Sequence, residues 1–187
     1  MKSTTTLAAL NALFLTTASA QYFNLLSSRS ASPIHLQPLS ASNQSLWLNK
    51  PTASYCPSNI QTTGACPPGN TTNFAGGDNS LGMGTVVPGG QQVYIDAETG
   101  AVKYTIAHSA AIPEGDIVTG WNLTEGESFG YLANEHGGFI ACPAEGEDEG
   151  SSWQVFVALE CLEFDEACLG FSAIASNSTG AAAWQYT

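Results

Sequence analysis

The chain has 187 residues, of which 4 are basic and 16 are acidic, so its formal net charge is −12. Charged residues make up only 11% of the chain, against roughly 25% in an ordinary soluble domain. Because nucleic-acid binding needs clustered lysine and arginine, this composition excludes that class of protein. The hydrophobic fraction of 43% is sufficient for a buried core and excludes a disordered chain.

A secretory signal is expected at the N-terminus. Lys2 supplies a positive start, Leu7–Leu15 is largely apolar, and Ala18-Ser19-Ala20 has the small residues of a signal-peptidase site. We therefore expect residues 1–20 to be removed and residues 21–187 to form one secreted domain. No later stretch approaches the ~18 apolar residues of a membrane span, and the C-terminus lacks the run of a lipid-anchor signal, so no membrane attachment is expected.

The rest of the chain shows the two-residue alternation of strands rather than the 3.6-residue period of helices. Short runs rich in aromatic and β-branched residues, bounded by Gly, Pro, Asn or Ser, predict strands. The predicted strands cover residues 22–26, 34–37, 46–48, 92–96, 102–106, 129–133, 139–142 and 153–159. Ala97-Glu98-Thr99-Gly100 predicts a hairpin turn, with glycine where the loop needs a positive φ.

Two segments lie outside this strand pattern. Residues 52–80 predict a polar, loop-rich insert, and residues 176–187 predict a flexible tail. No interval of a dozen residues after the signal carries a convincing apolar helical stripe, which argues against a βαβ arrangement. The sequence therefore predicts an all-β fold, a single-domain antiparallel sandwich or barrel with long loops and about two disulfides.

The five cysteines predict two disulfides and one free thiol in an oxidising compartment. Several pairings satisfy this count. We favour Cys56 with Cys66, which bracket a Pro/Gly/Thr loop, and Cys142 with Cys168, which tie two late strands together. Cys161 is then left over, either buried and inert or available for an intermolecular bridge.

Four N-x-S/T sequons fit the expected export of the chain. Their asparagines are candidate glycosylation sites and would have to lie on the surface. The sites are Asn43, Asn70, Asn122 and Asn177.

One segment resembles the turn that carries a catalytic serine. Gly126–Gly130 matches the G-x-S-x-G pattern, with Ser128 at its centre. That turn needs a buried strand before the serine, a helix after it, and an acid and then a histidine later in the chain. Only Glu135 and His136 follow Ser128 closely, and they are adjacent to each other, so a surface turn is favoured over a small secreted hydrolase.

Other groups that could support chemistry are scattered or have simpler roles. His35, His108 and His136 form no metal-binding spacing. Asp96 and Glu98 flank the predicted hairpin turn, where acids commonly help to form turns. The acidic run over residues 145–149 lacks the order of a calcium loop and is interpreted as a solvated charge run. We therefore expect no enzyme activity, no metal and no cofactor.

The tryptophans suggest a different kind of site. Sugar-binding surfaces stack aromatic rings against pyranose faces, so exposed rings would suit a wall polysaccharide. Trp47 and Trp121 are the candidates for carbohydrate contact, and Trp121 is expected near the surface because it precedes the sequon at Asn122. Core packing is the alternative role for such rings.

The order of several segments resembles that of fungal secreted proteins of the PhiA type. The matching segments are Phe23-Asn24-Leu25, Ser32-Pro33-Ile34-His35, Tyr55-Cys56-Pro57, Cys66–Thr72, Val87–Asp96, Gly100-Ala101-Val102, Ala107-His108-Ser109, Phe139–Pro143, Trp153–Val157 and Cys168–Ala173. The resemblance implies a fungal cell-wall protein from a family associated with phialide and conidium development, with IgE-binding members. It implies no catalytic residues.

These observations lead to three hypotheses of function. The first is a secreted, glycosylated, non-enzymatic protein of the fungal wall or culture fluid, whose expected partners are wall polysaccharides or wall proteins. The alternative is a carbohydrate-binding module for wall glucan or chitin. The third is a small secreted hydrolase that uses Ser128 or a carboxylate pair.

Overall fold

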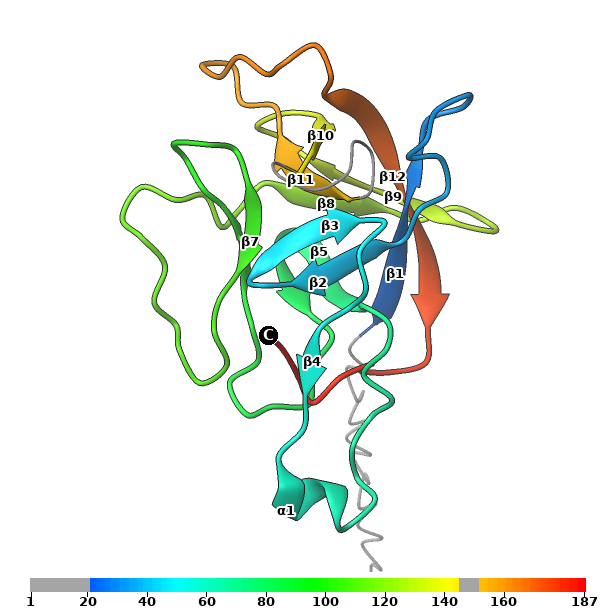
Figure 1. Cartoon of the computed structure of the whole chain (residues 1–187), viewed down its shortest axis with the longest axis vertical. Coiled ribbons are helices and arrows are strands. Elements are labelled where there is room, and N and C mark those ends of the chain that lie inside the picture. The colour runs from blue at the N-terminus through cyan, green and yellow to red at the C-terminus, as the bar shows by residue number, and fades with distance from the viewer. Residues whose placement is uncertain (1–20, 145–151) are drawn as a thin grey trace, which may run out of the picture.

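The computed structural model describes residues 21–144 and 152–187, so the expected signal peptide and the acidic run over 145–149 lie outside the described residues. Figure 1 shows that the regular elements of the described chain are almost all strands, joined by long loops. The elements are β1 (Tyr22–Ser28), β2 (Leu39–Ser42), β3 (Ser45–Leu48), β4 (Ser54–Tyr55), α1 (Ser58–Gln61), β5 (Phe74–Met83), β6 (Val93–Ile95), β7 (Val102–Tyr104), β8 (Trp121–Thr124), β9 (Gly130–Asn134), β10 (Phe139–Pro143), β11 (Trp153–Val157), β12 (Leu169–Ser178) and β13 (Gln185–Tyr186). No helix of the described residues is long and apolar enough to cross a membrane.

The strands form one curled antiparallel sheet and a separate pair, β4 with β13. β1 pairs with β12 along its whole length and with β5 at its start. Since β5 also pairs with β8, β8 with β9, and β9 with β12, these five strands close a circuit. From β12 the sheet continues through β10 and β11 to β3, to which β2 and the β6–β7 hairpin attach. The predicted all-β antiparallel fold is confirmed in this curled, barrel-like form.

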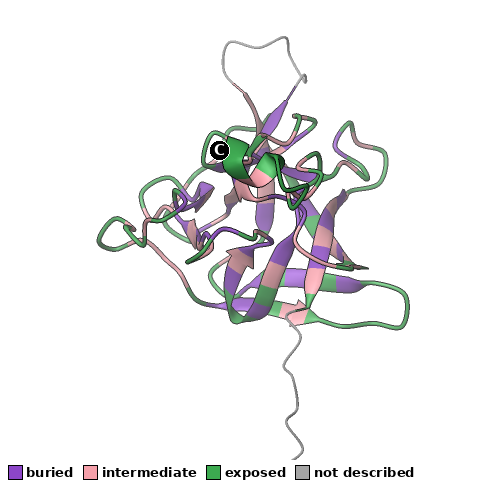
Figure 2. Cartoon of the chain, turned by 90° about the horizontal axis from the view of Figure 1, so that it is seen from below, coloured by how far each residue is buried: buried purple, intermediate pink, exposed green. Residues whose placement is uncertain are grey.

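The core fills the inside of the curled sheet. Side chains alternate between the two faces of a strand, so every second residue of β1 points inward. Figure 2 shows this alternation as bands of buried and more exposed residues along the strands. In the core the ring of Phe139 stacks on Trp121 and on Phe171, with centroids 6.3 and 5.6 Å apart.

Two consecutive glycines bend β5, which allows it to serve two neighbours. Gly76 and Gly77 have φ angles of 94° and 98°, which only glycine adopts at little cost. A Cβ atom on Gly77 would also lie 2.6 Å from the Cβ atom of Leu123. The residues before the bend pair with β1 and those after it pair with β8.

The predicted hairpin and seven of the eight predicted strands are present. Residues 97–100 join β6 to β7, and Gly100 has the expected positive φ of 76°. The strand predicted over 34–37 is wrong, because these residues form a turn between two prolines. In that turn Ser27 Oγ donates a hydrogen bond to the carbonyl of the buried Ile34.

Residues 176–187 were expected to form a flexible tail, and the structure corrects this expectation. Its first residues are the last residues of β12, and its last residues form β13, where Tyr186 is only 2% exposed. The side chain of Gln91 bonds to the backbone of Tyr186, accepting from its N–H at 2.7 Å and donating to its carbonyl at 3.0 Å. Tyr186 Oη accepts from the amide of Asn73 at 2.9 Å and donates to the carbonyl of Thr71 at 3.1 Å. This burial raises the pKa of Tyr186 to about 12, so the hydroxyl keeps its proton.

The expected loop-rich insert over 52–80 also needs correction at its C-terminal end. Residues 52–73 contain only the two-residue β4 and the four-residue α1, which has no buried residue. Residues 74–80, however, belong to β5, and Phe74 is fully buried. The ring of Phe74 stacks on Phe23, with centroids 6.0 Å apart. The loop-rich insert therefore ends just before Phe74, the first residue of β5.

Both favoured disulfides are present. Cys56–Cys66 closes the excursion that carries α1, and Cys142–Cys168 joins the end of β10 to the loop before β12. On the chain-entropy account, closing these loops contributes roughly 3 kcal/mol each. Cys161 is free and exposed, so a buried thiol is the wrong alternative for this residue.

The hydroxyl of Tyr186 offers a test of how the C-terminal segment is held. Tyr186→Phe should lower the free energy of unfolding by roughly 1–3 kcal/mol, because the buried amide of Asn73 loses its acceptor. Urea denaturation measures this loss. Tyr55→Phe, on the strand that pairs with β13, is the control because Tyr55 is 52% exposed. A Tyr186→Phe variant as stable as the wild type would contradict this account.

Candidate functional site

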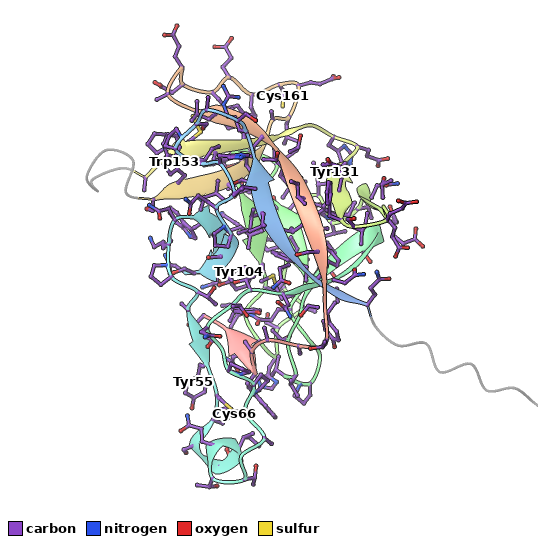
Figure 3. The ribbon with its side chains drawn as sticks, turned by 90° about the vertical axis from the view of Figure 1, so that its right-hand side faces the viewer. Tyr55, Cys66, Tyr104, Tyr131, Trp153 and Cys161 are labelled. Atoms are coloured by element: carbon purple, nitrogen blue, oxygen red, sulfur yellow. A yellow bond between two sulfur atoms is a disulfide. The ribbon has the colours of Figure 1, made fainter. Side chains whose placement is uncertain are left out.

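Four neighbouring strands, β1, β12, β9 and β8, turn one face of the sheet toward solvent. Their alternate side chains fill the core, so the remaining ones point outward. The register places Leu26 opposite Ile174 and Ile174 opposite Tyr131. These three side chains lie side by side across three strands. In Figure 3, β1 and β12 cross the face turned toward the viewer, and Tyr131 is labelled beside them.

An aromatic pair ends this line of apolar side chains. Phe129 lies in the turn between β8 and β9, and its ring meets that of Tyr131 edge to face at 5.6 Å. The two residues are 46% and 47% exposed. Aromatic rings of this size are usually buried, so an exposed pair is an informative feature of the surface. We call Leu26, Ile174, Tyr131 and Phe129 together the apolar row.

Neutral polar side chains flank the apolar row on the same face. They are the hydroxyl and amide residues Asn24, Ser28, Asn122, Thr124, Ser172 and Ser176. None of the residues in β1, β8, β9 and β12 is charged, although the chain as a whole carries 16 acidic residues. Carboxylates begin directly after the strands, at Glu125 and Glu135. Arg29 follows β1 directly, and its Nη1 donates to the carbonyl of Gly170 in β12 at 2.8 Å. The face is therefore an uncharged band with charged residues of both signs at its ends.

A groove of about 390 Å³ continues this face beyond β1. Leu26, Asn24 and Ser176 belong to both the face and the groove. The far side of the groove is formed by loop residues that include Pro38, Lys50, Pro51, Thr52, Asn70 and Thr71. The groove thus combines apolar proline rings with amide and hydroxyl groups and the basic side chain of Lys50, and it extends the apolar row into one long surface.

This surface suits an uncharged ligand that has both apolar faces and hydroxyl groups. The apolar row would supply contact area, and the flanking hydroxyl and amide groups would orient the ligand through hydrogen bonds. Tyr131, Phe129 and Ile174 were not among the site residues predicted from the sequence. The signal available for Tyr131 was its alternation with the apolar Leu132 within the predicted strand. The neighbour across the sheet, Ile174, requires the pairing of β9 with β12.

The residues considered for a serine hydrolase do not form its characteristic turn. Ser128 is exposed in the turn between β8 and β9, and the chain continues into a strand rather than a helix. Glu135 and His136 lie in the next turn, where their side chains approach to 3.5 Å. The depression around Ser128 is lined by Glu125 and Glu127 and by no histidine.

The histidines also stay apart from one another. His35, His108 and His136 are all exposed. Within residues 21–144 and 152–187, no group of three or more His, Cys, Asp or Glu side chains is arranged to hold a metal ion.

Asp96 forms hydrogen bonds within its own hairpin. Its Oδ1 accepts hydrogen bonds from the amides of Glu98 and Thr99, at 3.1 and 2.9 Å. Its Oδ2 accepts a 2.7 Å bond from Lys103 Nζ. Burial alone would raise the pKa of Asp96, but the bonds from Lys103 and Thr99 outweigh it and hold this pKa below its usual 3.8. Asp96 therefore forms the turn and remains ionised at neutral pH.

The two candidate tryptophans have different surroundings. Trp121 is 2% exposed, so the expectation that it lies near the surface is wrong, and it cannot stack on a sugar in this fold. Adjacent strand residues point to opposite faces, so the exposure of Asn122 requires Trp121 to point inward. Trp47 is half-buried, and its Nε1 donates to the carbonyl of Ser42 at 2.8 Å. The ammonium of Lys50 lies 4.0 Å from the centre of the Trp47 ring.

All four candidate glycosylation sites have exposed asparagines: Asn43, Asn70, Asn122 and Asn177. The hydroxyl residues of two sequons are also exposed, Thr124 and Thr179. Thr72, in the sequon of Asn70, is instead buried, and its Oγ1 accepts from the amide of Ala41 at 2.8 Å. The positions of the asparagines are compatible with attached glycans.

Comparison with known proteins points to a single family. The family described as PhiA-like secreted protein matches residues 23–187. A protein of Arthroderma benhamiae described as "Uncharacterized secreted protein" is 34% identical over 161 residues, which cover 80% of this chain and 77% of that relative. No solved structure matches the chain.

The bonds of Asp96 lead to a pH-dependent prediction. Because its folded-state pKa is lowered, the carboxylate stabilises the fold above pH ~3.9, and this contribution is lost as the pH falls through the lower folded-state value. Asp96→Asn should therefore cost roughly 1 kcal/mol at neutral pH, and the cost should shrink in acid. Urea midpoints at several pH values measure it. Glu98→Gln, on the same turn but exposed, is the control. If the cost of Asp96→Asn is independent of pH, the stabilising role of the Asp96 carboxylate is contradicted.

Proposed function

Because the chain belongs to the PhiA-like secreted protein family, we propose that it is a secreted, glycosylated, non-enzymatic protein that associates with the fungal cell wall. The observation that carries the wall association is the uncharged band on β1, β8, β9 and β12. In a chain of net charge −12, a neutral face with exposed aromatic rings suits contact with neutral wall polymers. Recognition by IgE and a part in conidium development, which the resemblance implies, belong to the same proposal.

The non-enzymatic part of the proposal rests on where the candidate catalytic groups lie. Ser128 precedes a strand, Asp96 is bonded within its own turn, and the histidines are exposed on separate segments. The apolar row, by contrast, offers apolar contact, and no histidine or carboxylate belongs to it beside the hydroxyl of Tyr131.

A carbohydrate-binding module for wall glucan or chitin is the second candidate function. The groove of about 390 Å³ favours it, because its prolines, amides and hydroxyls adjoin the exposed aromatic pair. This candidate is narrower than the first, since a protein can be held in the wall through other wall proteins.

Fractionation of fungal cells that express the protein tests its wall association. We expect the protein in the wall fraction and the culture fluid. It should resist extraction by 1 M salt, because the uncharged band does not depend on ion pairs and salt screens charges over about 3 Å at that strength. Detergent and reductant extractions serve as comparisons, with a secreted protein of similar acidity as the control. Finding the protein solely inside cells would overturn the proposal.

Enzymatic removal of N-glycans tests the glycosylation. We expect the secreted protein to lose mass, and each Asn→Gln change at an occupied sequon to remove one glycan. Because Asn70, Asn122 and Asn177 are exposed, their variants should unfold within about 0.5 kcal/mol of the wild type, whereas Asn43→Gln should cost more because Asn43 has a φ of 52°. Mass spectrometry of the intact protein measures occupancy, and a secreted protein whose mass equals that of the bare chain would refute glycosylation.

A further inference from the structure

We propose that the apolar row and the groove beyond β1 form one extended binding surface for an uncharged polysaccharide chain. This inference rests on the proposed wall association and names the surface responsible. It moves the carbohydrate contact away from Trp121, which is buried, to Tyr131, Phe129, Ile174 and Leu26.

The apolar row and the groove form a continuous surface. Phe129 contacts Tyr131, Tyr131 is paired with Ile174, and Ile174 is paired with Leu26. Leu26 then lines the groove that leads to Pro51. Because neighbouring strands are spaced by about 4.8 Å, the part of the row on β1, β12 and β9 spans two strand spacings, about 10 Å, and the groove lengthens it. A surface of this length suits an extended polymer better than a compact small molecule.

The side chains of this surface match the groups that a sugar ring presents. The two faces of a pyranose ring carry C–H groups and its rim carries hydroxyls, so it needs apolar contact together with neutral donors and acceptors. The exposed rings of Phe129 and Tyr131 supply the apolar contact. Ser172, Ser176 and Thr124, which lie on the same face, supply hydroxyls.

The charges around the surface favour a neutral ligand. The strands that carry the row have no charged side chain, whereas Glu125 and Glu135 follow β8 and β9, Arg29 follows β1, and Lys50 lines the groove. A polymer of either charge would therefore meet a like charge beside the row. A cationic polymer would gain nothing from the row itself. The observations therefore favour a neutral chain such as a glucan or chitin.

A second protein is a poorer match for the same surface. Serine and alanine are depleted in protein interfaces, and arginine, methionine and aromatic residues are enriched. The aromatic Phe129 and Tyr131 and the neighbouring Arg29 are of the enriched kinds, but the row is surrounded by the depleted kinds, at Ser28, Ser172, Ser176 and Ala133. Hydroxyls at these positions are instead suited to hydrogen bonding with sugar hydroxyls.

Retention on insoluble β-glucan and on chitin tests the proposal, with the full secreted protein as the sample. The double variant Tyr131→Ser/Ile174→Ser should lose affinity by about tenfold or more, because it removes a half-exposed ring and its apolar neighbour from the contact. The matched control is Tyr55→Ser/Ile106→Ser, which changes the same residue types at exposed positions outside the row. Thermal unfolding of both variants establishes that each is folded. Leu26→Ser, placed where the row enters the groove, provides a second row variant if the double variant unfolds.

The variant Trp47→Ala provides a second comparison in the retention assay. The Trp47 ring lies outside the row, and it reaches the groove only through the ammonium of Lys50, so Trp47→Ala should lower retention less than the row variants do. Loss of binding in Trp47→Ala with full binding in the row variants would overturn the proposed surface.

The remaining outcomes are equally decisive. The proposed surface is overturned if the row and control variants are retained equally, or if the wild type is retained on neither polymer. Wall association is then still decided by the fractionation experiment. Retention that begins only after Asn122→Gln would mean that the chain's own glycan occupies the row, which also overturns the proposal. A dimer that the row variants dissociate in sedimentation would assign the row to a second copy instead. Retention of the wild type together with its absence from cell walls would support the surface and refute the proposed function.

Discussion

The pairing of β1 with β12 is the constraint on which the rest of the structure depends. The two strands are joined over seven residue pairs, from Tyr22 opposite Ser178 to Ser28 opposite Ser172. Because β1 also pairs with β5, this contact between the two ends of the domain closes the circuit of five strands. It brings the inward side chains of both strands into one core. It also fixes Leu26 beside Ile174 on the outer face, since a slip of one residue would exchange the two faces.

The same closure explains why the C-terminal segment is ordered. After β12 the chain returns along the barrel and inserts Tyr186 against Tyr104, with ring centroids 6.4 Å apart. Its backbone is bonded by the amide of Gln91, and its hydroxyl is bonded by the loop before β5. A polar side chain buried as deeply as Gln91 is tolerated because its bonds are satisfied. The last residues thus connect the β6–β7 side of the sheet to the loop that borders the groove.

Local patterns in the sequence predicted those elements whose residues favour strands by themselves. The β6–β7 hairpin was predictable because Val93–Ile95 and Val102–Tyr104 flank a turn that ends in Gly100. β12 was missed because its many alanine, serine and glycine residues have low strand propensity, and pairing on both sides compensates for this. Tyr186 was assigned to a tail because its partner, Gln91, is 95 residues away in the chain. The exposed row was missed for the same reason, since it exists only once β1, β12 and β9 are adjacent.

The error at Trp121 shows how a local rule can mislead when the element type is unknown. A neighbouring sequon suggests exposure for a residue in a loop, but in a strand it implies the opposite face. Once β8 is formed, the exposure of Asn122 and the burial of Trp121 are one geometric fact. The same alternation places Leu132 in the core and Tyr131 outside it. On this part of the sheet the register therefore buries the tryptophan and exposes the tyrosine.

An exposed apolar row raises the question of how the protein remains soluble. The row lies on a sheet face whose strands are already paired on both sides, so it offers few free backbone groups for strand addition. Hydroxyl and amide groups interrupt its apolar area, and carboxylates follow the strands at Glu125 and Glu135. Acidic charge at these ends opposes the approach of a second negatively charged copy while leaving a neutral polymer unaffected. Concentrating the acids outside the four strands thus favours solubility and is compatible with the proposed uncharged partner.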